Sequence, residues 1–311
     1  MSDLVIGVVI VLTVSAAAWI AGSALARRLP RAGGELFALA SLVLLLAYTI
    51  LLWDRPELTR LLPFSNTIVL GNWFPPLAVF LAAIAWRLVP GSVLRRTAST
   101  AALTGMAFYS LIRPLTGGPP VCDDRWTSDG FCMQTTGATC SAAAAATLLK
   151  LHGIDTTERE MAKLCLTRKG THWLGLYRGL KLKTSGTPWK VEVVACDARD
   201  VVASGDVPMI AAVGPSFEDA KLRSELGPDN GWHAGVQHSV LLIGSAPRGV
   251  VEVFDPHPAY QRERWDREIF ERLWRGHGIR LVRHTDVDGR SGAGRIAIGS
   301  GAGRYHSPQR R

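Results

Sequence analysis

Four long uncharged runs in the first 116 residues constrain this chain more than any other feature. They extend over residues 4–26, 36–53, 61–86 and 97–112. A helix needs about 20 apolar residues to cross the hydrocarbon of a bilayer, and somewhat shorter helices also occur. One such run could be the buried helix of a water-soluble protein, but several in succession favour a membrane. The sequence therefore predicts a membrane domain of about four transmembrane helices in residues 1–116.

The arginines at the ends of these runs predict how the helices are oriented. The first and third loops carry six of them: Arg27, Arg28, Arg31, Arg87, Arg95 and Arg96. The second loop carries two arginines, which two acidic residues offset. Because arginine-rich loops stay in the cytoplasm, four crossings place residues 117–311 outside it, whereas three crossings place them inside. The fourth run is the weakest, and with it we expect an integral protein of a bacterial inner membrane whose C-terminal domain is extracytoplasmic.

Composition changes sharply after the last apolar run. Residues 116–120, Thr-Gly-Gly-Pro-Pro, are typical of a linker. Residues 117–284 have the mixed composition of a globular domain, whereas residues 285–311 hold six glycines, five arginines and few large apolar groups. That composition predicts a disordered basic tail, because it cannot bury enough apolar surface to fold.

Several functional classes are disfavoured by what the sequence lacks. The formal charge is +9, but the arginines gather at the ends of apolar runs and in the tail, without the aromatic and basic stripe of a nucleic-acid binder. No phosphate-binding G-x-x-x-x-G-K-[ST] loop is present, so the chain carries no ATPase of its own. No C-x-x-C pair is present either, and we expect neither a metal nor another cofactor.

Helical patterns precede strand patterns in residues 117–284. Alanine and leucine predict a helix over residues 141–152, which Gly153 ends, and the capping-box spacing of residues 157–160 opens a second helix to about residue 165. Runs typical of strands occupy residues 190–195, 207–213, 237–244 and 250–255, and helical spacing returns over residues 264–275. The predicted fold is α+β, a helical half followed by an antiparallel sheet half.

Cys140 stands where the alanine-rich helix begins. A thiol attacks an amide as the thiolate, which a helix N-terminus and a neighbouring histidine both favour. A thin alanine helix would also let the sheet half approach closely. A cysteine beside a helix is nevertheless more often a small buried apolar residue, so its neighbours decide between the two readings.

His238 and Asp255 are the residues that could make Cys140 a nucleophile. His238 opens the strand "HSVLLIG", and Asp255 closes the strand "VEVFD" that follows it. Antiparallel neighbours would bring both to one edge of the sheet, where the carboxylate can hold the imidazole tautomer. The Gln134 side-chain amide could donate to an oxyanion, together with the backbone N–H of Cys140. His233, in the loop "GPDNGWHAG", is the alternative base.

These residues and their surroundings resemble the papain-like peptidases that process bacteriocins after a double-glycine leader, family thirty-nine of the cysteine peptidases. The matching segments are Q-x5-C at Gln134 and Cys140, "LLKLHG", "VPMIAAV", "HSVLLIG", "VEVFDP" and "LWRGHG", in order over residues 131–278. The resemblance implies a thiol protease with nucleophile Cys140, general base His238, orienting Asp255 and oxyanion donor Gln134. It also implies a peptide substrate and a transporter as partner.

The chain departs from that family's pattern in two respects. Family members often have an acidic residue before the nucleophile and glycine after it, where this chain has Thr139 and Ser141. They usually carry the peptidase ahead of a transporter membrane domain and an ATPase, whereas here the membrane part comes first. Two other functions stay open, a thioester-forming acyltransferase of the transglutaminase kind and a papain-like domain that only binds a peptide.

The remaining cysteines and histidines lack comparable neighbours in the sequence. Cys165 and Cys196 are expected in the core, and Cys122 and Cys132 could pair if the domain lies outside the cytoplasm. Four histidines are expected on the surface or in loops: His152, His172, His257 and His277.

Overall fold

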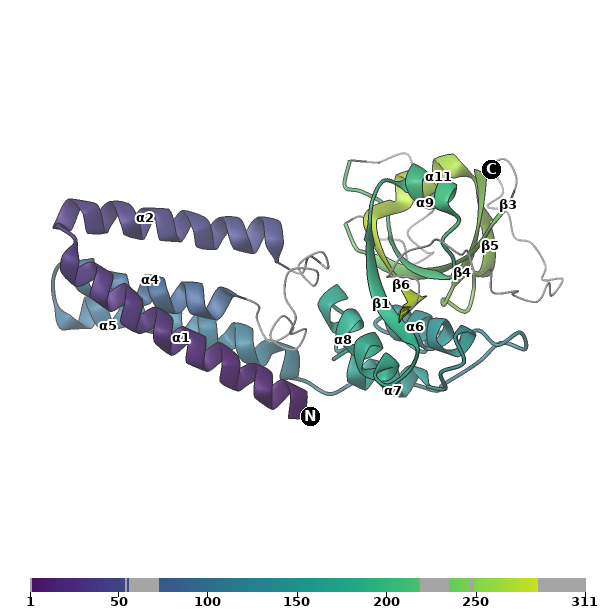
Figure 1. Ribbon diagram of the computed structural model, residues 1–311, viewed down its shortest axis with the longest axis horizontal. Coiled ribbons are helices and arrows are strands. Elements are labelled where there is room, and N and C mark those ends of the chain that lie inside the picture. Colours follow the sequence, from purple (N-terminus) through teal and green to yellow (C-terminus); the bar gives the residue numbers. More distant parts are fainter. Residues whose placement is uncertain (1, 54, 56–72, 219–234, 247–248, 285–311) are drawn as a thin grey trace. The chain divides into compact units, whose positions relative to one another are not determined.

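The computed structural model divides the chain into two compact units, an N-terminal unit of residues 1–117 and a C-terminal unit of residues 118–311. The residues that it describes are 2–53, 55, 73–218, 235–246 and 249–284 (Figure 1). The predicted tail, the alternative base His233 and most of the second loop of the N-terminal unit lie outside these residues.

The N-terminal unit is a bundle of helices built from the apolar runs. The helices are α1 (Ser2–Arg28), α2 (Arg31–Ala47) with the π-helical turn η1 (Tyr48–Leu52), α4 (Phe74–Leu88), and α5 (Val93–Ile112) with the 3-10 turn η3 (Arg113–Leu115). Helix α4 packs against α1, α2 and α5. Pro75 and Pro76 stand in its first turn, where a missing N–H costs no helical hydrogen bond.

Two of the four predicted crossings are long and apolar enough to span a bilayer in the described structure. They are Asp3–Arg28 and Arg31–Leu52. The third run yields the shorter apolar helix Phe74–Leu88, and the rest of that run lies outside the described residues. The fourth yields α5, which begins at Val93 and takes Arg95 and Arg96 into its first turn, so its apolar character is lower than that of the first two.

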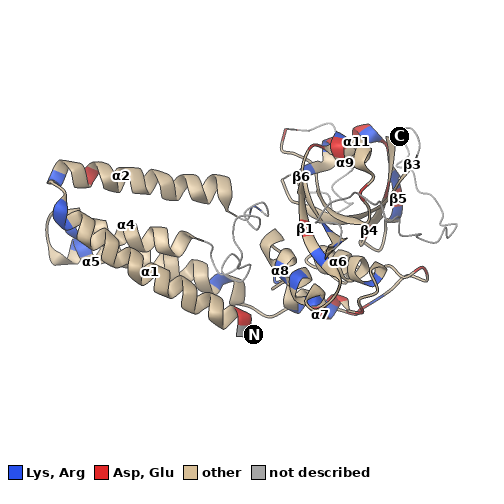
Figure 2. Cartoon of the chain, in the orientation of Figure 1, with Lys and Arg blue, Asp and Glu red and all other residues tan. Residues whose placement is uncertain are grey.

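The arginines of the first and third loops gather at one end of the bundle (Figure 2), whereas Arg113, in the turn η3, follows the opposite end of α5. Helices α1 and α4 end there with Arg27, Arg28 and Arg87. Helices α2 and α5 begin there with Arg31, Arg95 and Arg96. The first and third loops therefore lie at the same end, as helices that alternate in direction require.

The C-terminal unit combines an antiparallel sheet with helices, as predicted. Its helices are α6 (Cys140–Leu151), α7 (Glu158–Leu164), α8 (Trp173–Thr184), α9 (Ala198–Ser204) and α11 (Arg267–Leu273). Its strands are β1 (Trp189–Ala195), β2 (Met209–Val213), β3 (His238–Ala246), β4 (Val250–Asp255), β5 (Gln261–Trp265) and β6 (Trp274–Arg283). The strand order is β1-β6-β2-β3-β4-β5, and every neighbouring pair is antiparallel.

Two apolar cores lie on opposite faces of this sheet. Helices α6, α7 and α8 bury their apolar side chains against one face, which Ile210, Leu241 and Phe254 line. Helices α9 and α11 cover the other, where the sheet curls around them (Figure 1). Strands β2, β3, β4 and β6 contribute to both cores, because successive side chains alternate between faces.

The alanines of α6 let this helix approach the sheet closely. Ala142, Ala143, Ala144, Ala145 and Ala146 are all completely buried. Helix α6 contacts β2 and β3, so its N-terminal residue is carried to the sheet half of the unit.

Two predictions about the C-terminal unit are wrong. The helix expected over residues 264–275 is only α11, because Trp265 ends β5 and Trp274 begins β6, both paired in the sheet. His277, expected on the surface or in a loop, is buried within β6, where its ring packs edge-on against Trp173. His152 does lie in a turn, after α6, and its buried ring packs edge-on against Trp189. One half of the predicted capping box is present, since the Thr157 hydroxyl accepts the Glu160 N–H at 3.1 Å, whereas the Glu160 carboxylate bonds to Thr156 and Lys183.

Candidate active site

Strand pairing brings His238 and Asp255 to one end of the sheet. His238 is the first residue of β3 and Asp255 the last residue of β4, and the two strands are antiparallel neighbours. Alternation places His238 on the face of Val240, and Asp255 on the face of Val253, which both line the same core. The His238 Nε2 and Asp255 Oδ1 atoms are 2.8 Å apart.

The Asp255 carboxylate is fixed from a second side. It is almost completely buried, and its Oδ1 also accepts the backbone N–H of His257 at 2.8 Å. A buried carboxylate with these two partners holds one ring nitrogen of His238, which leaves Nδ1 for another partner.

Cys140 supplies that partner from the opposite half of the unit. It is the first residue of α6, and the charge of His238, with hydrogen bonding from the His238 side chain and the Ser239 N–H, lowers the pKa of its thiol against the effect of burial. A second link lies beside it, because the hydroxyl oxygens of Ser141 and Ser239 are 2.8 Å apart. The residues that follow Cys140 and His238 are thus joined directly, which holds the thiol and the imidazole in register.

The electrostatics of the Cys140–His238 pair favour its charged form. Burial alone raises the pKa of the Cys140 thiol, but the His238 charge and hydrogen bond outweigh it, so the net pKa lies below the ordinary value. Burial alone lowers the pKa of His238, but Asp255 and the Cys140 thiolate raise it well above the ordinary value. A thiolate beside an imidazolium is a nucleophile with an adjacent proton donor.

The other four cysteines are held as thiols. Burial raises the pKa of Cys122 to about 11 and the pKa values of Cys132 and Cys165 to about 12, and it also raises that of Cys196. Cys122 and Cys132 are both buried free thiols. Among the five, Cys140 alone has a lowered pKa.

Gln134 lies in the loop that leads into α6. It is buried, and its backbone N–H donates to the carbonyl of Pro256, the residue after Asp255, at 2.8 Å. Its side-chain Oε1 is buried with no hydrogen-bond partner among the described residues. The structure therefore brings Cys140, His238 and Asp255 into one hydrogen-bonded set, and it brings the Gln134 backbone beside that set.

Sequence reasoning missed the Ser141–Ser239 contact and the buried Glu158, whose carboxylate binds the loop before α6. Ser141 had one signal, because it replaces the glycine that resembling peptidases have after the nucleophile. Glu158 had none beyond its place in a capping box, since nothing in the sequence pairs it with Thr135. Within the described residues, no three His, Cys, Asp or Glu side chains are grouped to hold a metal ion.

No protein-family profile and no curated protein matches the chain. Among solved structures it is similar to the peptidase domain of Streptococcus ComA, a bi-functional ABC transporter of a quorum-sensing pathway, at 20% identity and a TM-score of 0.38, over 49% of this chain and 97% of that one. It is also similar to a double-glycine motif protease from an AMS/PCAT transporter, solved with its leader peptide, at 17% identity and a TM-score of 0.38, over 54% and 99%. The Streptococcus mutans ComA peptidase domain gives 20% identity and a TM-score of 0.31, over 49% and 98%. Likenesses this distant do not transfer an activity.

Proposed function

We propose that this chain is a membrane-anchored cysteine peptidase whose nucleophile is Cys140. The observation that carries the proposal is the chain of contacts from the Cys140 thiol, with its lowered pKa, through His238 to the buried Asp255. A domain that only binds peptides has no need of a thiolate beside an imidazolium, or of a carboxylate on the other side of that imidazolium.

In this mechanism the Cys140 thiolate attacks the carbonyl carbon of a peptide bond and forms a tetrahedral oxyanion. The His238 imidazolium then gives its proton to the departing amine, and a thioester to Cys140 remains. His238, now neutral, takes a proton from water, which attacks the thioester and releases the carboxylate product. Asp255 keeps the imidazole oriented and favours its charged form throughout.

Two donors would stabilise the oxyanion. Cys140 is the first residue of α6, so its backbone N–H is not used by a hydrogen bond within the helix. Gln134 is buried with an unpartnered amide oxygen, and a buried amide of this kind costs about 1–3 kcal/mol when left unsatisfied. A 180° rotation exchanges the amide O and N atoms, and the NH2 group would then find in the oxyanion the partner that the free site lacks.

The substrate in this proposal is a peptide or protein that meets the enzyme close to the membrane. The segments shared with double-glycine leader peptidases favour cleavage after Gly-Gly, and with it a separate transporter as partner. Anchoring rests on the two long apolar helices, α1 and α2 with η1. Because the arginines of the first and third loops share one end of the bundle (Figure 2), we place that end in the cytoplasm and the peptidase outside it.

An activity-based thiol probe tests the chemistry. The full chain in detergent is treated at pH 7, and labelled peptides are identified by mass spectrometry. We expect Cys140 alone to be labelled, since the pKa values of the other four thiols are raised. No labelling, or equal labelling of all five cysteines, would favour a domain that only binds peptides. Adding a primary amine to the reaction separates hydrolysis from acyl transfer, because only a transferase forms the amide product efficiently.

A pair of reporters fused after Thr116 tests the topology. One reporter is active only in the cytoplasm, and the other only outside it. We expect the outside reporter to be active, which corresponds to four crossings. Cytoplasmic activity at this junction would mean three crossings and an inward-facing peptidase.

A further inference from the structure

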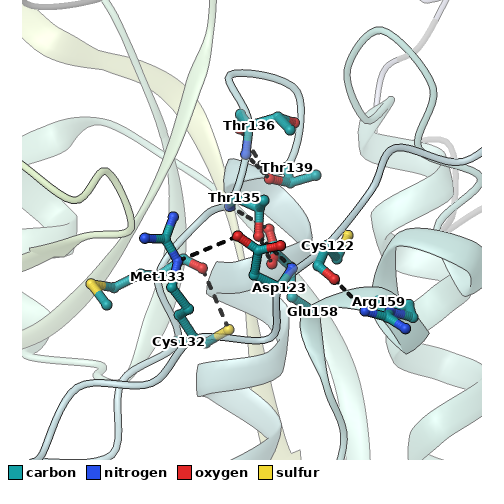
Figure 3. A network of polar contacts seen from close by, with 10 residues as sticks. Cys122, Asp123, Cys132, Met133, Thr135, Thr136, Thr139, Glu158 and Arg159 are labelled. Atoms are coloured by element: carbon teal, nitrogen blue, oxygen red, sulfur yellow. Dashed lines mark hydrogen bonds and ion pairs between the residues drawn. The ribbon is translucent and has the colours of Figure 1, made fainter.

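A buried carboxylate grips the loop that connects Gln134 to Cys140 (Figure 3). Glu158, the first residue of α7, is completely buried. Its Oε1 accepts the backbone N–H of Thr135 at 2.7 Å, and its Oε2 accepts the Thr135 hydroxyl at 2.6 Å. The same hydroxyl oxygen accepts the backbone N–H of Asp123 at 2.8 Å. Thr135 is thus held by three hydrogen bonds directly beside Gln134.

The rest of that loop forms hydrogen bonds within itself. Its position therefore depends on the contact between Thr135 and Glu158. The Thr139 hydroxyl accepts the N–H of Thr136 at 3.0 Å and donates to the Thr136 carbonyl at 3.0 Å. At its other end, the Gln134 N–H binds Pro256, beside Asp255. A displacement at Thr135 would therefore be passed to the adjacent Gln134 rather than absorbed by the loop, whereas the Cys140 end is held separately by the Ser141–Ser239 contact.

Capping of α7 does not account for Glu158. The hydroxyl of Thr157 caps that helix by accepting the Glu160 N–H. The exposed carboxylate of Glu160 instead binds Lys183 and Thr156 on the surface. A completely buried carboxylate is unfavourable unless it is hydrogen-bonded, and Thr135 is where both oxygens of Glu158 find their donors.

We propose that Glu158 is a positioning residue of the active site, which sets the Gln134 amide relative to the Cys140 nucleophile by fixing Thr135. This inference rests on the proposed peptidase function. It predicts a loss in the chemical step without a change in the nucleophile, because the Cys140–His238–Asp255 contacts do not pass through Glu158.

Four variants of the full chain test it: Glu158→Gln, Thr135→Val, Thr135→Ser and the control Glu160→Gln. The glutamine in place of Glu158 keeps the size of the side chain but presents an NH2 group to the Thr135 hydroxyl. Valine in place of Thr135 keeps the shape of threonine without its hydroxyl, whereas serine keeps the hydroxyl. The substrate is a quenched fluorescent peptide that the wild-type chain cleaves, taken from a set with a central Gly-Gly, and Cys140 alkylation by iodoacetamide is followed in parallel.

We expect Glu158→Gln and Thr135→Val to lower kcat by about 10- to 100-fold, with KM within about twofold, since small misplacements of reacting groups have effects of this size. Thr135→Ser and Glu160→Gln should remain near wild type. The rate and pH profile of Cys140 alkylation should be unchanged in all four. If Glu158→Gln fails to fold, the difference in kcat between Thr135→Val and Thr135→Ser is sufficient to test the positioning role.

Two results would overturn the positioning role while leaving the peptidase intact. One is an unchanged kcat in Glu158→Gln and Thr135→Val. The other is a joint fall of kcat, alkylation rate and melting temperature, which would mean that Glu158 only holds the fold together. Hydrolysis that Cys140→Ala does not abolish would instead refute the proposed function, and this inference with it.

Discussion

The two units distribute their apolar side chains differently. In the N-terminal unit many large apolar residues face outward, as at Leu36 (69% exposed) and Ile50 (77% exposed), and the buried set mixes large residues such as Ile84 with small ones such as Ala82. In the described part of the C-terminal unit, only four large apolar side chains are exposed: Val121, Leu182, Phe217 and Val236. Its buried set includes large residues such as Phe131 and Phe254.

This difference is the one expected if the two units face different solvents. A water-soluble monomer rarely exposes a continuous apolar surface as large as that of α1 and α2. In lipid the hydrophobic effect no longer drives helices together, and close packing of small residues takes its place. We infer that the N-terminal unit supplies attachment and the C-terminal unit supplies chemistry, and each prediction below tests that division.

The largest effect should come from Cys140→Ala. We expect hydrolysis to fall by roughly 10⁴-fold or more, as for the loss of a nucleophile in other triads, while folding and membrane retention are unchanged because alanine suits α6. The measurement is the rate of peptide cleavage together with carbonate extraction of membranes. Cys196→Ala is the matched control and should retain full activity. Equal activity in the two variants would show that the Cys140 thiol is not the nucleophile.

Gln134→Ala should have the next largest effect. Loss of one oxyanion donor lowers kcat by about 10²–10³-fold and leaves KM nearly unchanged, because that interaction is used mainly in the transition state. Steady-state kinetics with a cleaved peptide separate the two parameters. A rise in KM with kcat intact would assign Gln134 to substrate binding instead.

His238→Ala should change the reactivity of the thiol itself. With His238 absent, burial is the main influence left on Cys140, so its pKa should rise above the ordinary value. We expect alkylation of Cys140 at pH 7 to slow by about tenfold or more, and to recover only at higher pH. The pH profile of iodoacetamide labelling measures this. If His233→Ala gives the larger shift, the base is His233.

Most residues of the candidate site could be named from the sequence because they are marked locally. Cys140 opens an alanine-rich helix, while His238 begins one strand and Asp255 ends the next, so antiparallel pairing of consecutive strands brings the last two together. Contacts between residues of different segments could not be predicted in this way. Ser141 meets Ser239 across 98 residues, and Glu158 meets Thr135 across 23. Nothing in its own segment distinguishes Glu158 from any other glutamate, and Ser141 is marked only by standing where the resembling peptidases have glycine.

The helix predicted over residues 264–275 failed for a related reason. Trp265, Ile269, Leu273 and Trp274 have helical spacing, and α11 does use the middle of this segment. Both tryptophans, however, belong to strands of the sheet, where Trp265 pairs with Val251 and Trp274 pairs with Val213. Periodicity over ten residues cannot report pairing with strands that lie elsewhere in the chain.

Glu263→Gln should abolish a loss of stability that the C-terminal unit undergoes between about pH 4.5 and about 7. Burial, with a further contribution from Asp255, raises the pKa of Glu263 from about 4.5 to about 7, against the hydrogen bond from Trp265. A raised pKa adds stability that is complete below pH 4.5 and is lost as pH rises through 7. Glutamine accepts the same Trp265 N–H without ionising, so the variant should gain up to about 3 kcal/mol over wild type between about pH 4.5 and 8. Denaturant unfolding at several pH values measures the difference, and a gap that is constant with pH would contradict it.

Gly22→Leu should show the smallest effect, and on the other unit. A Cβ at Gly22 in α1 would lie 2.8 Å from the Phe80 carbonyl of α4, closer than such atoms approach in proteins. Overpacking of this kind costs about 1–3 kcal/mol, and the better helix propensity of leucine returns up to about 1 kcal/mol. We therefore expect a bundle about 1–2 kcal/mol less stable in detergent. Gly105→Leu in α5 is the control, because a Cβ there meets nothing within 4 Å. Peptide cleavage should be equal in both variants and in wild type, since no group of the site lies in the bundle. A loss of kcat in Gly22→Leu alone would show that helix packing in the N-terminal unit governs the chemistry, and the division between attachment and catalysis would then be wrong.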